Sequence, residues 1–525
     1  MKQPPVLHPY FFALYAVLGV YAQRPQELPV QWIVRPFLIL LAITLLVYLV
    51  ARKLTADSQR AGFTASLFLA WLFMGHVRNL LIETFSFRPS LAQELFLLAA
   101  WTSLLAMLAS GWTWRRIKIP EMLTNFLNVA SWVVILLPTY FFMVFVSQAV
   151  QQAGVISEKE PILAPVALSA TNTPLPDVYL IILDAYGGED FLRETFQYDN
   201  SQFIADLRER GFYIATQSRP NYPQTQLSLS SLLNLNYLDK WTSGLEGTNN
   251  RAPLTEAIRH SEVRRALADL GYQTVNIPNS TLISSIEDSD VYLPMDSIPL
   301  NQFEGIILST TVLDTFAQRW DMGIPVSGYA THRRTIQHQL DALKIVPELP
   351  GPKFVFVHIL APHPPFVFNE DGDPVQPNAL FTLGDGGGFP GSAEEYEEGY
   401  RQQVAYVNQQ MRDVLDAILE NSATQPIILL QGDHGPGSRF DMLSLDRVAC
   451  LRERYSIFNA YYFPGQKYDG LYPSITPVNS FRVIFNTFFG AQLPLLDDKN
   501  YYASYASPYQ FEDVTERIEP SCAVP

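Results

Sequence analysis

The first 150 residues differ from the rest of the chain because most of their apolar residues stand in long runs. The runs cover residues 6–22, 36–51, 62–82, 91–111 and 122–148. A helix that spans a bilayer needs about 20 mainly apolar residues. The second, fourth and fifth runs meet this requirement clearly, whereas the first is short and contains His8 and Pro9. We therefore expect residues 1–150 to form a transmembrane bundle of about five helices.

Basic residues indicate the orientation of this bundle. They cluster in the loops at 52–60 and 115–118, which two apolar runs separate. Loops rich in Lys and Arg stay on the cytoplasmic side, so both loops lie on that side. The fifth helix then crosses outward. The pattern predicts a multi-pass protein of the plasma (inner) membrane, in contact with the lipid bilayer, with everything after about residue 150 extracytoplasmic.

The charge of the two halves is opposite in sign. Residues 1–150 contain 11 of the 36 basic residues and 5 of the 51 acidic residues. The rest of the chain therefore contains 25 basic and 46 acidic residues. A nucleic-acid binder needs a basic face to replace counterions, and no such cluster exists in the acidic half. We exclude nucleic acid as a partner. Residues 151–176 are rich in Ala, Pro, Ser and Thr and are predicted to form an extended linker.

The acidic half contains short, continuous apolar runs separated by amphipathic helical stretches. The runs are VYLIILD (178–184), FVFVHIL (354–360) and PIILLQGD (426–433). Such runs are typical of strands buried on both faces in a parallel sheet. Alternating strands and helices predict an α/β domain over residues 177–525 with a mainly parallel central sheet. Sites in such sheets lie at the carboxyl ends of strands, where Asp184 and Asp433 fall.

Three residues at these strand ends are suited to bind a divalent metal ion. Asp184 ends the first run, and Asp433 and His434 end the third, within GDHG. Carboxylate and imidazole groups are common ligands of divalent metals. A strand-ending Asp can also be an ordinary turn former or helix cap. His363, in the loop after the second run, is placed to touch a substrate, whereas His358 within that run is interpreted as a core histidine.

Thr225 is the candidate nucleophile. It follows the Pro-containing turn NYPQ and begins an apolar stretch that we expect to be a helix. A hydroxyl at a helix start lies beside free backbone N–H groups, which suits a phosphate or sulfate, and a metal ion can activate it for attack. The alternative is an ordinary Thr N-cap. Ser228, one turn further on, is the competing hydroxyl.

Several segments together resemble the alkaline phosphatase and sulfatase superfamily. APHPPF (361–366) resembles the sulfatase P-H-x-P-F motif, and GDHG (432–435) resembles the D-H-G metal motif. Residues 400–420 resemble the helix after the sulfatase lid region, with Asn408 where Asp is usual, and 480–490 resemble a later helix that ends in Gly. The resemblance covers roughly residues 177–490 and implies an extracytoplasmic sulfatase-like catalytic domain.

Two departures favour one branch of that superfamily. The chain has no C/S-x-P-x-R motif for formylglycine, and Ala185 follows Asp184 where sulfatases have a second aspartate. In this respect the chain looks more like lipoteichoic acid synthases and phosphoethanolamine transferases. That resemblance implies one divalent metal ion, with Mn or Zn favoured and Ca or Mg as alternatives, held by Asp184, Thr225, Asp433 and His434. It also implies that Thr225 is the nucleophile and that His363 binds the ester.

The function predicted from these features is that of a membrane-anchored, metal-dependent hydrolase or transferase. It would act on a phosphoester through a covalent threonine intermediate, and the anchor favours transfer of a lipid head group to a cell-surface acceptor. The expected substrate is a phospholipid or surface glycan. The alternatives are a sulfuric ester hydrolase and a non-catalytic surface protein on this fold.

Two features leave alternatives open. Cys450 and Cys522 form no metal motif and are equally compatible with one disulfide or with two unpaired thiols. Residues 371–391 form a long loop rich in Gly and Pro. It is interpreted either as a lid over the site or, with slight preference, as a plain surface insertion.

Overall fold

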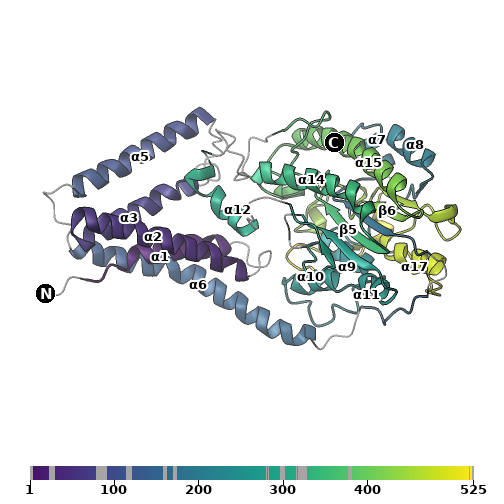
Figure 1. Cartoon of the computed structure of the whole chain (residues 1–525), viewed down its shortest axis with the longest axis horizontal. Coiled ribbons are helices and arrows are strands. Elements are labelled where there is room, and N and C mark those ends of the chain that lie inside the picture. The colour runs from purple at the N-terminus through teal and green to yellow at the C-terminus, as the bar shows by residue number, and fades with distance from the viewer. Residues whose placement is uncertain are drawn as a thin grey trace. The chain divides into compact units, whose positions relative to one another are not determined.

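The computed structural model divides into two compact units (Figure 1), which we call the helical unit and the α/β unit. The helical unit consists of Met1–Ser157 and Asp296–Thr331, and the α/β unit of Glu158–Met295 and His332–Pro525. The structure describes residues 4–22, 30–77, 91–113, 121–157, 162–169, 174–279, 281, 283–295, 302–314, 316, 328–375, 381–519 and 521–522.

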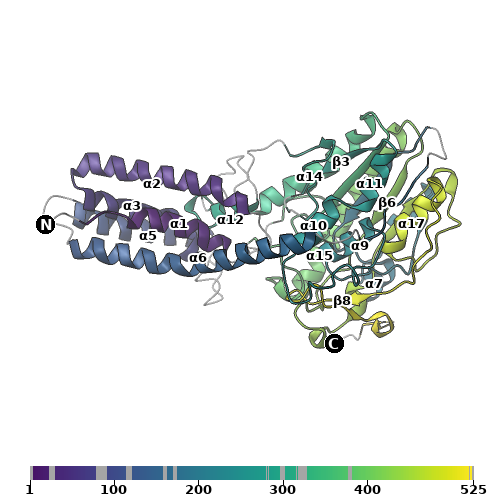
Figure 2. The ribbon, with the colours of Figure 1, turned by 90° about the horizontal axis from the view of Figure 1, so that it is seen from below.

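The helical unit contains the helices expected from the five apolar runs. They are α1 (His8–Tyr21), α2 (Val34–Thr55), α3 (Ser58–Leu72), α5 (Leu91–Thr113) and α6 (Glu121–Ser157), with a 3₁₀ turn η1 (Val30–Ile33) before α2. Figure 2 shows α1, α2, α3 and α6 running side by side. Helix α6 extends beyond the predicted end of the bundle at residue 150. Helix α3 stops before residue 82, where the third run ends, and residues 78–90 lie outside the described part.

Two of these helices are long and apolar enough to cross a bilayer. They comprise Val30–Thr55, with a mean hydropathy of 2.5, and Glu121–Ser147, with 2.2. The apolar stretch Leu95–Leu108 in α5 is shorter. The described residues therefore confirm N-terminal apolar helices, and a bundle of about five membrane-spanning helices stays a prediction.

The helical unit also contains a segment that lies far along the sequence. Helix α12 (Gln302–Ser309) packs Phe303, which is fully buried, edge-to-face on Tyr21 of α1 at a ring distance of 5.9 Å. Glu304 forms an ion pair with Arg35. This segment was not predicted from the sequence because its short apolar stretch, FEGIIL, is far below the length of a spanning helix.

A seven-stranded sheet forms the centre of the α/β unit. Its strands are β1 (Val178–Leu183), β2 (Tyr213–Ile214), β3 (Gln273–Ile277), β4 (Val291–Tyr292), β5 (Lys353–Ile359), β6 (Ile427–Gln431) and β7 (Asn459–Tyr462). Their order is β2-β7-β6-β1-β5-β3-β4. The run from β6 to β4 is parallel, and only the pairings of β7 with β6 and with β2 are antiparallel. The mainly parallel sheet is confirmed.

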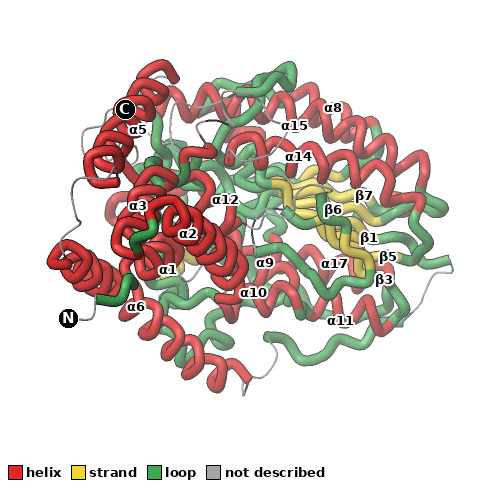
Figure 3. Tube along the Cα trace, turned by 60° about the vertical axis from the view of Figure 1, so that its left-hand side comes forward, coloured by secondary structure: helices red, strands yellow, loops and turns green. Residues whose placement is uncertain are grey.

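Helices cover both faces of this sheet (Figure 3). One face carries α9 (Thr225–Leu233), α10 (Ala252–Arg259), α11 (Glu262–Asp269) and α17 (Pro477–Phe488), and the other carries α8 (Ser201–Glu209), α14 (Gly328–Ile345) and α15 (Ala393–Asn421). Alternate residues of the central strands, such as Leu180, Phe356 and Leu429, join the core beneath the first set. All residues of β1, β5 and β6 are buried, which explains their continuous apolar sequence.

The shorter elements connect this framework. They are α7 (Glu189–Thr195), α16 (Leu451–Arg454), the small antiparallel pair β8 (Tyr501–Tyr502) and β9 (Glu512–Asp513), and the 3₁₀ turns η2 (Val346–Glu348), η3 (Gly386–Gly388), η4 (Leu445–Arg447), η5 (Pro464–Gln466) and η6 (Thr515–Arg517). Cys450, just before α16, forms a disulfide with Cys522. Of the two alternatives for the cysteines, the disulfide is therefore the one found.

A buried ion pair joins the starts of β1 and β5. The Lys353 ammonium donates to Asp177 Oδ2 at 2.6 Å and to the Leu349 carbonyl at 3.0 Å, and Asp177 Oδ1 accepts from the Lys353 backbone N–H at 3.1 Å. The two side chains are 11% (Asp177) and 2% (Lys353) exposed. Because buried charges need partners, this pair ties the two strands whose far ends carry the site.

We predict that Lys353→Met destabilises the α/β unit by about 3 kcal/mol or more, because it leaves the Asp177 carboxylate buried without its cation. Thermal and urea unfolding of the full chain measure this loss. Arg193→Met is the matched control, since Arg193 pairs with Asp190 on the surface, with 53% of the Arg193 side chain exposed. The control should unfold like the wild type, and equal effects in the two variants would contradict the assignment.

Candidate active site

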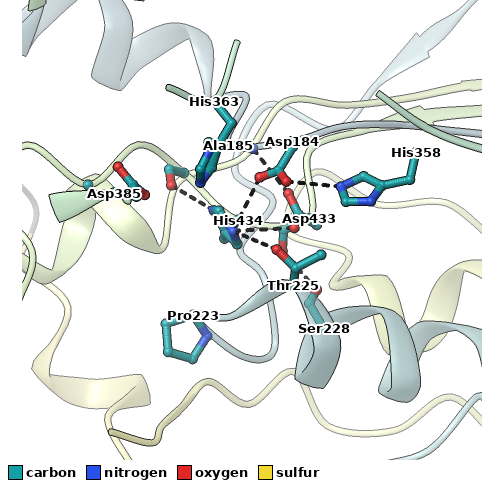
Figure 4. A network of polar contacts seen from close by, with 12 residues as sticks. Asp184, Ala185, Pro223, Thr225, Ser228, His358, His363, Asp385, Asp433 and His434 are labelled. Atoms are coloured by element: carbon teal, nitrogen blue, oxygen red, sulfur yellow. Dashed lines mark hydrogen bonds and ion pairs between the residues drawn. The ribbon is translucent and has the colours of Figure 1, made fainter. Parts of the chain in front are cut away.

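The carboxyl ends of neighbouring strands bring the predicted site residues together (Figure 4). Asp184 follows β1 directly, and Asp433 and His434 follow β6, which pairs with β1 in parallel. Thr225 is the first residue of α9, and His363 lies in the loop after β5, on the other side of β1. Figure 4 shows the side chains of all five converging on one region. The structure therefore assembles every residue that the sequence analysis selected for the site.

Asp184, Asp433 and His434 form a buried cluster of metal-ligand type. Their ligand atoms all lie within 4.8 Å of one another. His434 Nε2 is 3.4 Å from Asp184 Oδ1 and 3.3 Å from Asp433 Oδ2. Neither of these two carboxylate oxygens accepts a hydrogen bond from a described residue, although both are inaccessible to water. Buried carboxylate oxygens are normally paired, so these two are free to bind a cation.

The histidine of this cluster is arranged as an acceptor. Its Nδ1 lies 3.0 Å from the carbonyl of Gly435, to which it can only donate. In the neutral ring Nε2 then carries a lone pair, and the guanidinium of Arg454 donates to it at 3.1 Å. Burial, followed by the charge of Arg454, lowers the pKa of His434 despite the nearby carboxylates. Two carboxylates and a neutral imidazole are O and N donors of the kind that bind a divalent metal ion, and the Nε2 lone pair would bind the ion in place of the Arg454 N–H.

Other groups hold these ligands in place. Asp184 Oδ2 accepts from His358 Nε2 at 3.0 Å, and Asp433 Oδ1 accepts from the backbone N–H of Ala185 at 3.1 Å. Burial alone would raise the pKa of Asp184, but His363, His358 and His434 outweigh it and hold the pKa below its ordinary value. His358 is buried, as expected of a core histidine, yet it also orients a candidate ligand.

The turn after β1 has an unusual backbone. Ala185 has a φ of 62°, a conformation that residues with a Cβ rarely adopt. The turn directs the Ala185 N–H toward Asp433, and the Ala185 carbonyl accepts from the Tyr400 hydroxyl at 2.8 Å. Such strained residues persist where the surroundings fix them, often at functional sites.

The two candidate hydroxyls have different surroundings. Thr225 Oγ1 lies 3.2 Å from His434 Nε2, and the N-cap of α9 is Gln224, which makes no side-chain cap hydrogen bond. Thr225 is therefore the first helical residue rather than the cap. Ser228 is buried and donates to the backbone carbonyl of Asp433 at 2.7 Å. Its hydroxyl is engaged in holding the β6 turn, so Thr225 has the better position for chemistry.

His363 faces the same region from the opposite side. Its ring centroid is 6.3 Å from that of His434, and its backbone N–H donates to the Asp184 carbonyl at 3.0 Å. Its Nδ1 lies 2.5 Å from the Pro364 carbonyl, so Nδ1 donates. Gln403 of α15 donates to the His363 carbonyl at 3.0 Å. These contacts fix the loop and position the ring beside the metal-ligand cluster.

Arg454 and Asp385 belong to the site and were missed by the sequence analysis. Arg454 is buried, donates to the Pro223 carbonyl at 2.7 Å and forms an ion pair with Asp385. The Tyr396 hydroxyl donates to Asp385 at 2.8 Å. Burial alone would raise the pKa of Asp385, but the positive charge of Arg454 outweighs this effect, so the pKa is lowered. The guanidinium therefore brings a fixed positive charge to His434.

Asp385 lies in the loop at 371–391, of which residues 376–380 are outside the described part. Its side chain is 6% exposed, and adding a Cβ at Gly386 would place it 2.4 Å from the Phe440 carbonyl. The described residues around Asp385 thus pack against the site, and the interpretation as a plain surface insertion is wrong for them. Gly384 and Gly386, which flank Asp385, were the available signal, because close backbone approach at these two positions leaves no room for a Cβ. Arg454, within LRERY, gave no signal.

Asn408, which replaces the usual Asp, does not reach the metal-ligand cluster. Its Oδ1 accepts from the Tyr186 hydroxyl at 2.6 Å, and its Nδ2 donates to Asn200 Oδ1 at 2.8 Å. Tyr186 follows Ala185 in the turn after β1. The substitution therefore falls in a buried network that supports the turn, and the candidate ligands are unaffected.

Comparison with known proteins identifies the family. The family model described as Sulfatase matches residues 176–482. No curated protein matches the chain. Among solved structures, the C-terminal periplasmic domain of EcEptC from Escherichia coli, in complex with Zn, aligns at 11% identity over 68% of this chain and 98% of that one, with a TM-score of 0.44.

Two further structures give similar values. The 2-O GAG sulfatase BT1596 aligns at 13% identity over 63% of this chain and 73% of that one, with a TM-score of 0.40. The soluble domain of lipooligosaccharide phosphoethanolamine transferase A from Neisseria meningitidis aligns at 12% identity over 62% and 93%, with a TM-score of 0.36. Because the family model covers more than half of the 525 residues, the chain belongs to the Sulfatase family of enzymes, within the alkaline phosphatase and sulfatase superfamily.

Proposed function

We propose that the protein is a membrane-anchored, metal-dependent enzyme that transfers or hydrolyses a phosphoester through a covalent intermediate on Thr225. The observation that carries the proposal is the position of the Thr225 hydroxyl. It lies 3.2 Å from His434 Nε2, at the first residue of α9 and beside the Asp184, Asp433 and His434 cluster. A nucleophile, metal ligands and free helix N–H groups therefore meet at one point.

Asp184, Asp433, His434 and Thr225 would hold one divalent metal ion, with Mn or Zn favoured and Ca or Mg as alternatives. Oxygen and imidazole donors suit all of these ions to different degrees. When bound there, such an ion would make the Thr225 hydroxyl more acidic and would offset negative charge on the transferred group. His358 and the Ala185 N–H hold the two carboxylates and so keep the site in one geometry.

The chain's own residues can perform both steps. Thr225 Oγ attacks the phosphorus and forms an O–P bond while the bond to the leaving oxygen breaks. The Thr225 proton passes to that oxygen, which leaves as an alcohol, and a phospho-threonine remains. The backbone N–H groups of the first turn of α9 would stabilise the oxygens of the phosphoryl group, together with His363 in its protonated form, while Arg454 adds positive charge through its contact with His434. In the second step water or an acceptor hydroxyl attacks the same phosphorus, and the Thr225 oxygen leaves. The identity of that acceptor decides between hydrolase and transferase.

Sulfate-ester hydrolysis by a formylglycine is the competing function, and three features disfavour it. Formylglycine requires a Cys or Ser at the nucleophile position, and Thr225 occupies it. Both cysteines are joined in the disulfide between Cys450 and Cys522. Ser228 holds the Asp433 carbonyl. The chain therefore keeps the sulfatase framework while the nucleophile favours phosphoryl chemistry.

The helical unit supports a membrane location. Large apolar side chains on α2 and α6 are exposed, including Leu46 and Leu137 at 62% each. Exposed apolar surfaces of this kind are expected to face lipid. The disulfide is typical of an oxidising compartment outside the cytoplasm. We therefore propose that the α/β unit is extracytoplasmic and that a phospholipid or surface glycan is its substrate.

Thr225→Ala should lower turnover of a phosphodiester by on the order of 10³-fold or more while the protein remains folded, because loss of a covalent nucleophile removes most of the rate enhancement. Steady-state assays with bis(p-nitrophenyl) phosphate measure this effect. Ser228→Ala is the matched control and should keep most of its turnover. Full activity in Thr225→Ala together with loss in Ser228→Ala would show that the wrong hydroxyl was chosen.

Asp433→Asn should remove the bound metal, because it replaces a carboxylate ligand with a weaker amide while retaining the shape of the side chain. Elemental analysis of the purified full chain should give about one ion per wild-type molecule and almost none for the variant. Asp469→Asn, at an exposed position, is the control and should retain the ion. Stoichiometric metal in Asp433→Asn would exclude Asp433 from the site.

A reporter fused after residue 170 should be on the extracytoplasmic side, because the basic loops at 52–60 and 115–118 place the fifth helix outward. Alkaline phosphatase fusions, which are active only outside the cytoplasm, measure this. A fusion within residues 52–60 is the control and should be inactive. The reverse pattern would overturn the proposed orientation.

A further inference from the structure

Two glutamines flank the proposed nucleophile in the sequence. Gln224 is the N-cap of α9, Thr225 is the first helical residue, and Gln226 is the second. The Gln224 backbone is extended, and its side chain makes no capping hydrogen bond to the helix. An N-cap side chain usually fixes the first turn by accepting from the N–H groups there. In α9 the Gln224 side chain binds neighbouring parts of the chain instead, and so does Gln226.

Arg251, the N-cap residue of α10, binds both glutamines. Its guanidinium donates through Nη2 to Gln224 Oε1 at 2.6 Å and through Nη1 to Gln226 Oε1 at 3.3 Å. Arg251 is 4% exposed, whereas Thr225 between the two glutamines is partly exposed. Because the donors of a guanidinium point in fixed directions, simultaneous contact with both glutamines limits rotation of the helix start.

The amide nitrogens of the same glutamines are also bound. Gln224 Nε2 donates to the Ala503 carbonyl at 2.6 Å, and Gln226 Nε2 donates to the Thr255 hydroxyl of α10 at 3.2 Å. Each amide group therefore has a partner at its oxygen and at its nitrogen. Neither side chain can turn away without the loss of two hydrogen bonds, so the residues on both sides of Thr225 are fixed.

Arg251 is itself held by residues 499–505, which we call the C-terminal segment. Its Nη2 also donates to the Tyr505 carbonyl at 3.1 Å, and its guanidinium carbon lies 4.3 Å from the centre of the Tyr505 ring. A guanidinium over an aromatic face is attracted by the ring electrons. The C-terminal segment therefore contacts Arg251 through Tyr505 and Gln224 through Ala503.

The C-terminal segment also contacts the loop that leads to the nucleophile. Asn500 Nδ2 donates to the Pro220 carbonyl, and the Tyr501 N–H donates to the Asn221 carbonyl, both at 2.9 Å. The match to the Sulfatase family model ends at residue 482, so these contacts come from a part of the chain beyond the matched region.

We propose that Arg251 is a positioning residue for the reaction at Thr225, an inference that rests on the proposed function. Arg251 holds the two flanking glutamines and joins them to the C-terminal segment. The Thr225 hydroxyl thereby keeps its direction toward His434 Nε2, which lies 3.2 Å away (Figure 4). A displacement of about 1 Å at a reacting group can cost about 100-fold in rate, so a small rotation of the first turn would slow the attack.

Arg251→Met in the full chain, assayed with bis(p-nitrophenyl) phosphate, tests this proposal. The kcat should fall roughly 100-fold, because the start of α9 is no longer held. KM and metal content should stay close to those of the wild type, because the candidate metal ligands follow β1 and β6 and a misplaced nucleophile affects the transition state rather than substrate binding. Gln226→Met is a milder second variant at a partly exposed position, and its kcat should fall roughly tenfold.

Arg482→Met is the matched control for a loss of stability. Arg482 is also buried and donates to two backbone carbonyls, those of Leu235 at 2.8 Å and Pro494 at 2.7 Å. Leu235 lies beyond the far end of α9 from Thr225. Thermal unfolding should show a loss of stability in both arginine variants, whereas the kcat of Arg482→Met, measured below its unfolding temperature, should equal that of the wild type.

Amide hydrogen exchange gives a readout that does not depend on turnover. Peptides that cover residues 220–229 should exchange faster in Arg251→Met than in the wild type or Arg482→Met, because the first turn of α9 opens more often. Wild-type kcat or wild-type exchange in Arg251→Met, or an equal loss of kcat in Arg482→Met, would overturn the proposal. Absence of turnover in the wild type would contradict the proposed function, and the exchange rates would still decide whether Arg251 holds the start of α9.

Discussion

Two buried carboxylates and an imidazole lone pair face one another at the ends of β1 and β6, and the rest of the site depends on this arrangement. Asp184 Oδ1 and Asp433 Oδ2 lie 3.4 and 3.3 Å from His434 Nε2, and the two oxygens accept no hydrogen bond from the described residues. The two carboxylates repel each other unless a cation lies between them, and the Nε2 lone pair accepts from the Arg454 guanidinium at 3.1 Å. The Gly435 carbonyl fixes the histidine tautomer, His358 fixes one carboxylate, and the Ala185 N–H fixes the other.

The fold provides this arrangement through strand order. Strand β1 lies between β5 and β6, so the residues that follow these three strands share one edge of the sheet. Helix α9 begins at the same edge and supplies both the Thr225 hydroxyl and free N–H groups. The buried Asp177–Lys353 pair at the opposite ends of β1 and β5 helps to hold the register of these strands. The strand order of the sheet therefore determines which residues meet at the site.

The α/β class, the parallel strands and the five residues that converge at the site could be predicted from the sequence, because each has a local signal. The strands are continuous apolar runs, and the candidate ligands stand directly after them. The contact between Arg454 and Asp385 was not predicted, because the two residues lie 69 positions apart, in α16 and in a distant loop. No local sequence pattern indicates a contact of this kind. Helix α12 was missed because a short apolar stretch has no distinctive period. The disulfide could be named only as one of two alternatives, because the sequence spacing of Cys450 and Cys522 does not show whether the two residues lie close together in the fold.

Covalent phosphorylation of Thr225 during turnover can be detected by peptide mass analysis after a rapid acid quench. The metal-loaded full chain is mixed with a phosphodiester substrate, quenched within the first turnovers and digested. We expect one phosphoryl group on the peptide that contains Thr225, localised to that residue by fragmentation and absent in Thr225→Ala. A phosphoryl group on Ser228, or turnover without any phosphorylated peptide, would contradict it.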